Sequence, residues 1–311
     1  MTSMTSESAA APRMLLGLPA PAKLNLFLHV IGRRADGKHL LESIFTLIDL
    51  ADEIDLTELP DGALERTGDL RSEARDDLCV RAALALREAA GPEAARLGAR
   101  IRVTKRIPAG AGMGGGSSDA ATTLIGLNRL WRLDFSVDQL AAIGERLGAD
   151  VPFFIRGRNA FVEGIGERIT PLSVPLARYA VLWPGRGVST AKIFASPSLT
   201  RDSESLRIPF FSDFIRNRWP KLPGRNDLQK TAIELEPVIL DALAALAPLG
   251  GEPRMTGSGS AVFTLMREDS EGLPPPQAPL PEGSLLFMAR GLAEHPLRAW
   301  TREAEEEIAG V

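Results

Sequence analysis

A glycine-rich run over residues 110–116 constrains this chain more than any other stretch, because five of its seven residues are glycine. A backbone without Cβ atoms can approach another group closely and point successive N–H groups at it. The residues before the run alternate as in a strand, with Ile101 and Val103 on one face, and the residues after it repeat as in a helix. A strand, a glycine loop and a helix N-terminus in this order are typical of a site that holds phosphate.

Two consecutive helices are predicted after the glycines. The first begins near Ser117, and its buried face is Ala120, Leu124, Leu127 and Trp131. Ser136 and Gln139 form a capping-box pair at the start of the second, which Gly148 is placed to end. Asp150 therefore follows just beyond a helix end.

The glycine run has two other interpretations. Gly110, Gly112 and Gly115 satisfy the dinucleotide-binding pattern GxGxxG, and Asp134 lies about the right distance downstream. That fold needs a strand after the first helix, whereas here a second helix follows directly. A flexible linker is the other alternative, but a linker is not expected between a clean strand and a well-capped helix. Phosphate binding is the favoured interpretation.

Residues 32–39, GRRADGKH, come within one residue of a Walker A phosphate loop. His39 stands where that loop needs a hydroxyl for Mg²⁺, and Asp36 would place a carboxylate among the phosphates. A turn at Asp36 and Gly37 is the prediction that turn chemistry favours.

Residues 23–31 alternate with a period of two and predict a strand. Its apolar face carries Leu24, Leu26, Leu28 and Val30, and its other face Lys23, Asn25, Phe27 and His29. Lys23 and Asn25 are therefore expected to point the same way, from the more polar face.

Composition excludes several classes of protein. The net charge of −4 argues against a nucleic-acid or membrane-surface partner, which needs a basic face. No window contains the roughly 18 apolar residues of a membrane-spanning helix. Cys79 is the only cysteine, so an internal disulfide and a cysteine-based metal site are excluded, and a soluble cytoplasmic protein is expected.

The length of 311 residues predicts two domains at about 150 residues each. We expect a loose tail over residues 1–13, one domain over residues 14–160 and a second over residues 161–311. Short strands are predicted around the second domain over residues 160–163, 179–183, 261–266 and 285–289. The proline-rich residues 272–283 predict an exposed loop.

Three motifs in order resemble the signature motifs of the GHMP kinases. They are residues 21–25 (PAKLN), 108–118 (PAGAGMGGGSS) and 255–263 (MTGSGSAVF). Further matches, at residues 34–37 with His39, 147–152 (LGADVP) and 226–228 (NDL), resemble the subgroup whose substrate is a cytidine-diphosphate-linked methylerythritol. Together the matches extend from residue 19 to residue 263.

This resemblance implies an α+β fold of two domains, with ATP bound by residues 14–160 and the active site in the cleft toward residues 161–311. It implies an enzyme that uses ATP with Mg²⁺ to phosphorylate an alcohol group of a small molecule, in non-mevalonate isoprenoid synthesis. A related kinase for homoserine or mevalonate and a non-catalytic nucleotide-binding regulator are the alternatives. The magnesium ligands and the oligomeric state stay open.

The resemblance also implies residue roles. Asp150 would be the general base, and Lys23 would stabilise the charge of the transferred phosphate. Asn25, His39 and Phe194 would bind the cytidine-containing substrate, although Lys38 stands where the family often has an aromatic residue. The ATP-binding residues would be Pro108, Ala109, Gly110, Ala111, Gly112, Met113, Gly114, Gly115, Gly116, Ser117 and Ser118.

Overall fold

The computed structural model describes residues 12–69, 76–206, 208–266 and 279–301. Within these residues the strands are β1 (Met14–Arg33), β2 (His39–Leu59), β3 (Leu64–Gly68), β4 (Gly98–Thr104), β5 (Ala160–Gly164), β6 (Arg168–Pro171), β7 (Arg178–Trp183), β8 (Arg254–Met255), β9 (Val262–Leu265) and β10 (Leu285–Leu292). The α-helices are α1 (Leu78–Ala90), α2 (Gly115–Trp131), α3 (Val137–Glu145), α4 (Val151–Arg156), α5 (Thr190–Ala195), α6 (Ile208–Arg218), α7 (Leu228–Leu235) and α8 (Val238–Leu246). Residues 1–11 of the expected tail and residues 272–278 of the proline-rich loop lie outside the described residues.

The ten strands are hydrogen-bonded into one sheet system whose path runs β3-β4-β2-β10-β7-β9-β8. Strand β2 is its centre, since β1, β4, β5 and β10 all pair with it. This mixture of a largely antiparallel sheet with helices is the predicted α+β class. The predicted strands of the second half correspond to β5, β7, β9 and β10, whereas the domain boundary near residue 160 stays a prediction.

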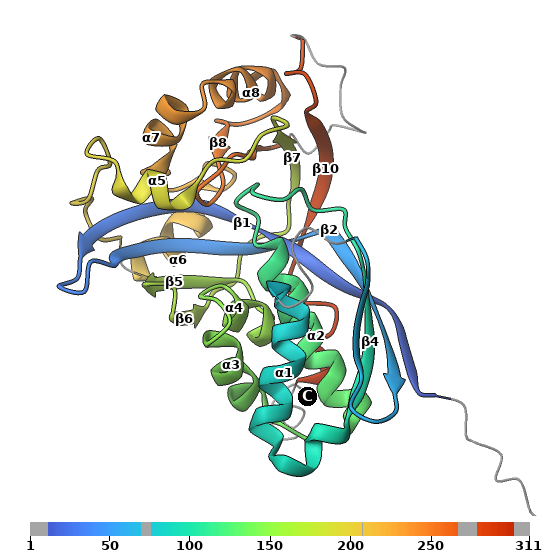
Figure 1. Ribbon diagram of the computed structural model, residues 1–311. Coiled ribbons are helices and arrows are strands. Elements are labelled where there is room, and N and C mark those ends of the chain that lie inside the picture. Colours follow the sequence, from blue (N-terminus) through green and yellow to red (C-terminus); the bar gives the residue numbers. More distant parts are fainter. Residues whose placement is uncertain (1–11, 70–75, 207, 267–278, 302–311) are drawn as a thin grey trace, which may run out of the picture.

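The longest feature of the fold is the hairpin of β1 and β2, which crosses the whole molecule (Figure 1). The predicted turn at its tip is confirmed, because the N–H of Gly37 donates to the carbonyl of Arg34 and Gly37 has a φ of 87°. The predicted polar face of β1 is not exposed. Residues 23–30 are all buried, since both sides of the strand are covered, and only Ile31 is partly exposed. The alternation also breaks, because the register shifts between Asn25 and Leu28 and places Leu26 and Phe27 in one apolar cluster.

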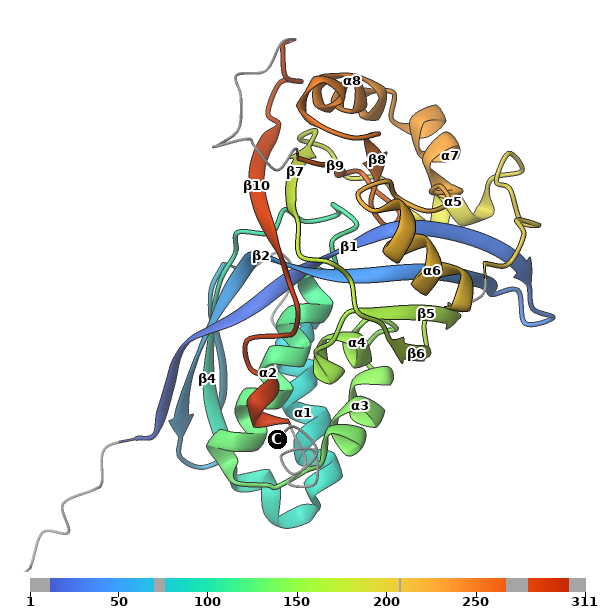
Figure 2. The ribbon, with the colours of Figure 1, turned by 180° about the vertical axis from the view of Figure 1, so that it is seen from behind.

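Helices α1 to α4 gather on one side of the hairpin, and α5, α7 and α8 lie on the other side with β7, β8 and β10 (Figures 1 and 2). Helix α2 begins at Gly115, so the predicted start near Ser117 was two residues late. The helix begins earlier because Gly114, with a left-handed φ of 73°, turns the chain into the helix at that point.

The connection after α2 decides between the glycine-loop interpretations. The predicted capping box of Ser136 and Gln139 is confirmed, and α3 follows α2 without an intervening strand. Asp134 is a loop residue between these helices, with φ of 55°. The dinucleotide-binding interpretation of the glycines is therefore wrong.

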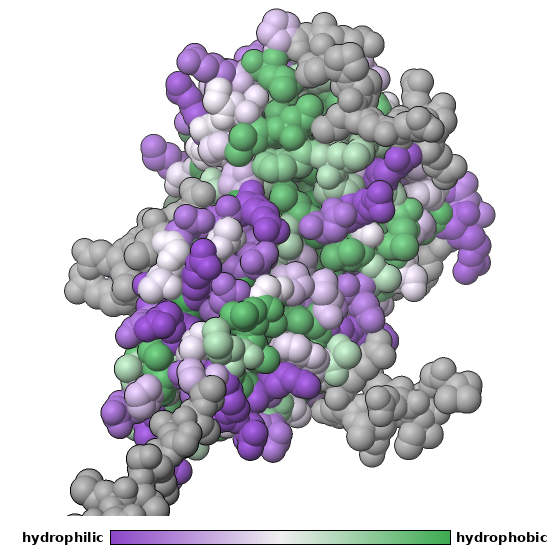
Figure 3. Space-filling view, turned by 90° about the vertical axis from the view of Figure 1, so that its right-hand side faces the viewer, coloured by the Kyte–Doolittle hydropathy of each residue, from purple (hydrophilic) through white to green (hydrophobic). Residues whose placement is uncertain are grey.

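Apolar side chains gather in the upper half of the face shown in Figure 3, the half that holds β7 and β10 in Figure 1. Leu285 and Met288 on β10 are among the exposed large apolar residues. No helix in the described ranges is both long and apolar enough to span a bilayer.

Candidate active site

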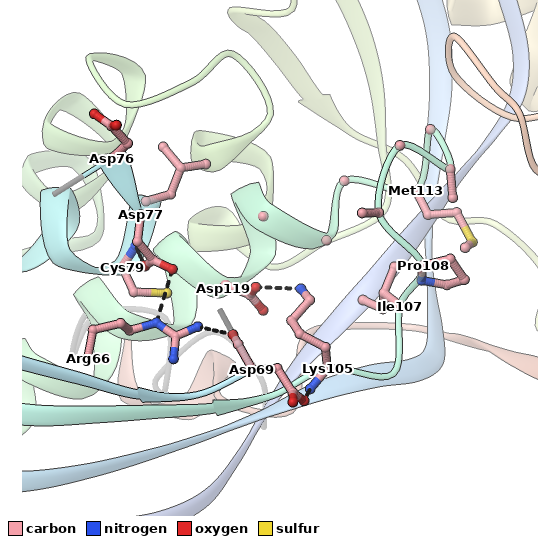
Figure 4. A pocket seen from close by; sticks show the side chains of 18 residues that line it. Arg66, Asp69, Asp76, Asp77, Cys79, Lys105, Ile107, Pro108, Met113 and Asp119 are labelled. Atoms are coloured by element: carbon pink, nitrogen blue, oxygen red, sulfur yellow. Dashed lines mark hydrogen bonds and ion pairs between the residues drawn. The ribbon is translucent and has the colours of Figure 1, made fainter. Parts of the chain in front are cut away.

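The glycine loop leads from β4 into α2 and lines a pocket of about 290 Å³. Figure 4 shows this pocket, with the loop on one side and Arg66, Lys105 and Asp119 on the other. Gly112 has a φ of 74°, and a Cβ atom there would overlap with the carbonyl oxygen of Thr256. The loop is thus shaped by backbone that only glycine adopts easily.

A buried charge cluster forms the floor of this pocket. The Nζ of Lys105 lies 2.6 Å from Oδ2 of Asp119 and also donates to Oδ2 of Asp52. The other oxygen of Asp52 accepts from the backbone N–H of Ile107 at 2.8 Å, which anchors the start of the loop. Burial raises the pKa of Asp119 to about 7, although the ammonium of Lys105 opposes that rise.

Sequence reasoning missed Asp52, Lys105 and Asp119. Lys105 and Asp119 flank the glycine motif closely, and that proximity was a usable signal. Asp52 had no local signal, because the pairing of Glu53 on β2 with Thr104 on β4 brings it to the loop.

A second pocket of about 310 Å³ lies on the other side of the loop, and Gly112 and Gly114 line both pockets. Besides these two glycines it brings together four further predicted site residues, which come from β1, α5 and the start of α4: Lys23, Asn25, Asp150 and Phe194. A molecule in the first pocket can therefore meet a molecule in the second across the glycine loop.

Lys23 and Asp150 face each other in the second pocket. Their Nζ and Oδ2 atoms are 3.9 Å apart, and Lys23 also donates to Oδ1 of Asn25 and lies 4.6 Å from the ring centre of Phe45. Only 4% of the Lys23 side chain is exposed, and burial lowers its pKa, an effect that the carboxylate of Asp150 partly offsets. A buried cation and a carboxylate in contact can stabilise negative charge and accept a proton.

Asp150 occupies the N-cap position of α4, yet its side chain makes no capping hydrogen bond. The carboxylate is 30% exposed, so it faces the open pocket. Its place past the end of the α3 segment is as predicted.

His39 and Phe194 lie together, although they are far apart in the sequence. Their rings stack with centroids 4.8 Å apart and planes 25° apart. Phe194 lines the second pocket from α5, and His39 reaches it from the start of β2, through this contact. Lys38 beside it is exposed.

The third motif holds the first two together. The hydroxyl of Thr256 accepts from the N–H of Asn25 at 2.9 Å, and the N–H of Ala261 donates to the carbonyl of Ala111 at 3.1 Å. Asn226 supports this loop from behind by donating to the carbonyls of Met255 and Gly257. The three motifs therefore form one contiguous structure.

The described ranges contain no group of three or more His, Cys, Asp and Glu side chains arranged to hold a metal ion. Two buried oxygens at the start of α2 nevertheless make no hydrogen bond, namely Oγ of Ser118 and Oδ1 of Asp119.

Residues 77–158 match the family model described as "GHMP kinases N terminal domain". The chain is 48% identical to a 4-diphosphocytidyl-2-C-methyl-D-erythritol kinase of Albidiferax ferrireducens, over 93% of this chain and 96% of the relative. A crystal structure of 4-(cytidine 5'-diphospho)-2C-methyl-D-erythritol kinase superposes with a TM-score of 0.71 at 33% identity, covering 90% of this chain and all of the other. A homoserine kinase of Cytophaga hutchinsonii shares the fold, with a TM-score of 0.60 at 16% identity, over 94% of this chain and 98% of that one.

Proposed function

The chain belongs to the 4-diphosphocytidyl-2-C-methyl-D-erythritol kinases of the GHMP kinase family, and from this premise we propose how its residues act. The enzyme transfers the terminal phosphate of ATP to the 2-hydroxyl of 4-diphosphocytidyl-2-C-methyl-D-erythritol, a step of non-mevalonate isoprenoid synthesis. The observation that carries this assignment is the 48% identity over nearly the whole length of both chains. The homoserine kinase matches in fold at only 16% identity, so it does not argue for a homoserine acceptor.

ATP occupies the first pocket in this proposal, with its phosphates along residues 110–116. The backbone N–H groups of the loop and the positive end of the α2 dipole attract phosphate there. The terminal phosphate then points past Gly112 and Gly114, the two glycines that line both pockets.

The acceptor hydroxyl lies in the second pocket, beside Asp150. Its oxygen attacks the terminal phosphorus of ATP, the bond from that phosphorus to ADP breaks, and the carboxylate of Asp150 takes the hydroxyl proton. The exposed face of Asp150 and its lack of a capping bond support this role, because the carboxylate is free to accept.

Lys23 stabilises negative charge as the phosphoryl group moves. Its ammonium is buried, which strengthens its electrostatic effect, and Asn25 and Phe45 fix its position. Asn25 also borders the pocket that receives the substrate.

Magnesium, when bound with ATP, neutralises charge on the phosphates. It keeps several waters and phosphate ligands, so it needs few protein ligands. The unpaired Oδ1 of Asp119 fits such an ion, because it is a hard oxygen donor on a residue that lines this pocket, and the unpaired Oγ of Ser118 is a second hard donor on the preceding residue. They are the residues that would hold it.

The cytosine ring binds at the far end of the second pocket, against Phe194 and His39. Stacking on one aromatic ring is worth about 1–3 kcal/mol per base. Because the two rings are nearly parallel, a base that lies beside His39, in the plane of its ring, also stacks on Phe194. The exposed alkyl chain of Lys38 replaces an aromatic neighbour here.

A coupled assay of ADP release tests the function. Purified enzyme receives ATP and Mg²⁺ with 4-diphosphocytidyl-2-C-methyl-D-erythritol, mevalonate or homoserine in parallel. Turnover is expected with the cytidine-containing acceptor alone. Equal or faster turnover with mevalonate or homoserine would refute the assigned acceptor, and ADP release without any acceptor serves as the background.

A further inference from the structure

Arg201 follows α5 and binds both aromatic residues at the far end of the second pocket. Its Nε donates to Nε2 of His39 at 3.1 Å, and its Nη2 donates to the carbonyl of Phe194 at 3.1 Å. The same guanidinium donates to the carbonyls of Ser196 at 2.7 Å and Leu199 at 3.0 Å. Three carbonyls therefore fix the plane of the guanidinium and aim its Nε at the His39 ring.

A guanidinium has five N–H donors and no acceptor. Nε2 of His39 must accordingly act as the acceptor, and a neutral imidazole that accepts at Nε2 carries its proton on Nδ1. Within the described part of the chain, Nδ1 of His39 has no hydrogen-bond partner. The structure thus leaves one N–H donor of fixed direction beside Phe194.

The electrostatic surroundings keep this imidazole neutral. Burial lowers the pKa of His39, and the positive charges of Arg201 and of Arg33 on β1 lower it further. The protonated ring, which would donate from both nitrogens, is disfavoured because it would place a donor against the donor of Arg201.

We infer that Arg201 is a positioning residue for base recognition, which fixes His39 in the Nδ1–H tautomer and holds it against Phe194 as one unit. This inference rests on the proposed function, since the partner of the Nδ1–H group is then an acceptor of the cytosine ring. Cytosine offers two such acceptors, O2 and N3, whereas uracil carries a proton on N3. A donor that meets N3 therefore distinguishes the two bases, whereas O2 accepts in both.

A lysine could not replace Arg201. An ammonium on a flexible stem is a point charge, and it cannot reach three carbonyls and an imidazole in one plane. Arg201→Lys keeps the positive charge near His39 and removes the planar fork. It separates the effect of orientation from the effect of charge.

The tautomer is measured directly by NMR of the enzyme labelled with ¹⁵N-histidine. The chain has three histidines, and His39→Gln identifies the signal of His39. We expect a protonated Nδ1 and an unprotonated Nε2 for His39. His295 is an internal reference for the opposite tautomer, because its Nδ1 accepts from the N–H of Leu297 and is therefore unprotonated. An Nε2–H tautomer at His39 in the wild-type enzyme would overturn the inference.

Kinetics then test the link to the substrate. Arg201→Lys should raise the KM for the cytidine-containing substrate about tenfold, because a misdirected polar partner loses its hydrogen bond, while the KM for ATP and kcat change little. In the same variant the His39 signal should lose its single tautomer. Arg225→Lys is the matched control, because Arg225 binds Asp227 and Ser203 and does not contact His39.

The outcomes separate this inference from the proposed function. Failure of the wild-type enzyme to phosphorylate 4-diphosphocytidyl-2-C-methyl-D-erythritol would refute the function and leave the tautomer measurement valid. Normal turnover, with an unchanged substrate KM in folded Arg201→Lys, would refute the positioning role alone. Arg201→Gln is the second variant. Calorimetric titration of this variant with cytidine 5'-diphosphate measures its affinity for the nucleotide without turnover.

Discussion

Asp150 combines a pocket-facing carboxylate with no structural hydrogen bond at the helix that it precedes. Asp150→Asn should therefore lower kcat by about 10²- to 10⁴-fold, the usual contribution of a positioned proton acceptor, while ATP and the acceptor still bind. The thermal midpoint should hardly change. Steady-state kinetics and calorimetric titration measure the two effects.

The matched control is Asp138→Asn. Asp138 lies exposed on α3, where it forms an ion pair with Arg156 of α4. Its kcat should equal that of the wild type. A structural role for Asp150 would give the opposite pattern, with lower thermal stability and an unchanged kcat in the folded fraction.

His295 makes stability depend on pH. Its Nδ1 accepts from the N–H of Leu297, its ring is almost fully buried, and burial lowers its pKa to about 4. The unfolded chain takes up the proton near pH 6.5, whereas the folded protein does so only near pH 4. Stability is therefore fully present above about pH 6.5 and falls as the pH drops toward 4, by about 3 kcal/mol.

Urea unfolding at pH 7 and pH 4.5 measures this loss. His295→Asn keeps an acceptor for Leu297 but cannot titrate, so its stability should change less with pH than that of the wild type. An identical pH dependence in both proteins would contradict the assignment to His295.

At the scale of single residues, the sequence was informative where a motif names a residue. Lys23, Asn25 and Asp150 were predicted from motifs and Phe194 from the family resemblance; all four line one pocket, while their roles remain predictions. Residues that act through other residues were not predictable. Arg201 lies outside every motif, and only the folded chain brings it to His39.

The glycine loop is the element whose shape depends most on the third motif. Gly112→Ala should lower the free energy of unfolding by about 1–3 kcal/mol more than Gly110→Ala does, because only the former Cβ overlaps with the loop at Thr256 and Gly259. Both glycines have positive φ, so the comparison removes that strain from the difference. Urea unfolding without nucleotide gives both values, and equal losses would contradict the predicted clash.

Elements with local signals were predicted well, as the capping box of α3 and the turn at Gly37 illustrate. The N-terminal part of β1 was not, because Pro19 and Pro21 argue against a strand. These prolines fit because, among the described strands, β1 pairs only with β2, so their missing N–H groups interrupt no central ladder.

At the scale of the whole molecule, Asn159 connects strands that are distant in the sequence. Its Oδ1 accepts from the N–H of Leu47 on β2, and its Nδ2 donates to the carbonyl of Leu292 on β10, both at 2.8 Å. Asn159→Ala should cost about 2–3 kcal/mol, because it leaves buried backbone groups unpaired. Denaturant unfolding checks this value against Asn217→Ala, an exposed asparagine on α6. A loss no larger than that of the control would contradict it.

The fold class followed from motifs, but the way in which the motifs meet did not. Thr256 touches Asn25 across most of the chain's length, and no local pattern encodes such a contact. The buried cluster of Asp52, Lys105 and Asp119 likewise depends on the pairing of β2 with β4. Long-range pairing therefore assembles the site from segments that carry their own signals separately.

The β1–β2 hairpin contributes residues to different parts of the site along its length. It carries Asp52 beneath the phosphate loop, Lys23 near its middle and His39 beside its tip, and the pairing of its two strands continues past all three with local register shifts. A closing motion that bent the molecule across this hairpin would disrupt the hydrogen bonds between β1 and β2. The tip, however, lies away from Lys23 and Asp150, and its residue His39 belongs to the proposed site for the cytosine ring. Evolution, or an engineer exchanging residues 33–39, can therefore retune which acceptor is chosen and leave phosphate transfer intact.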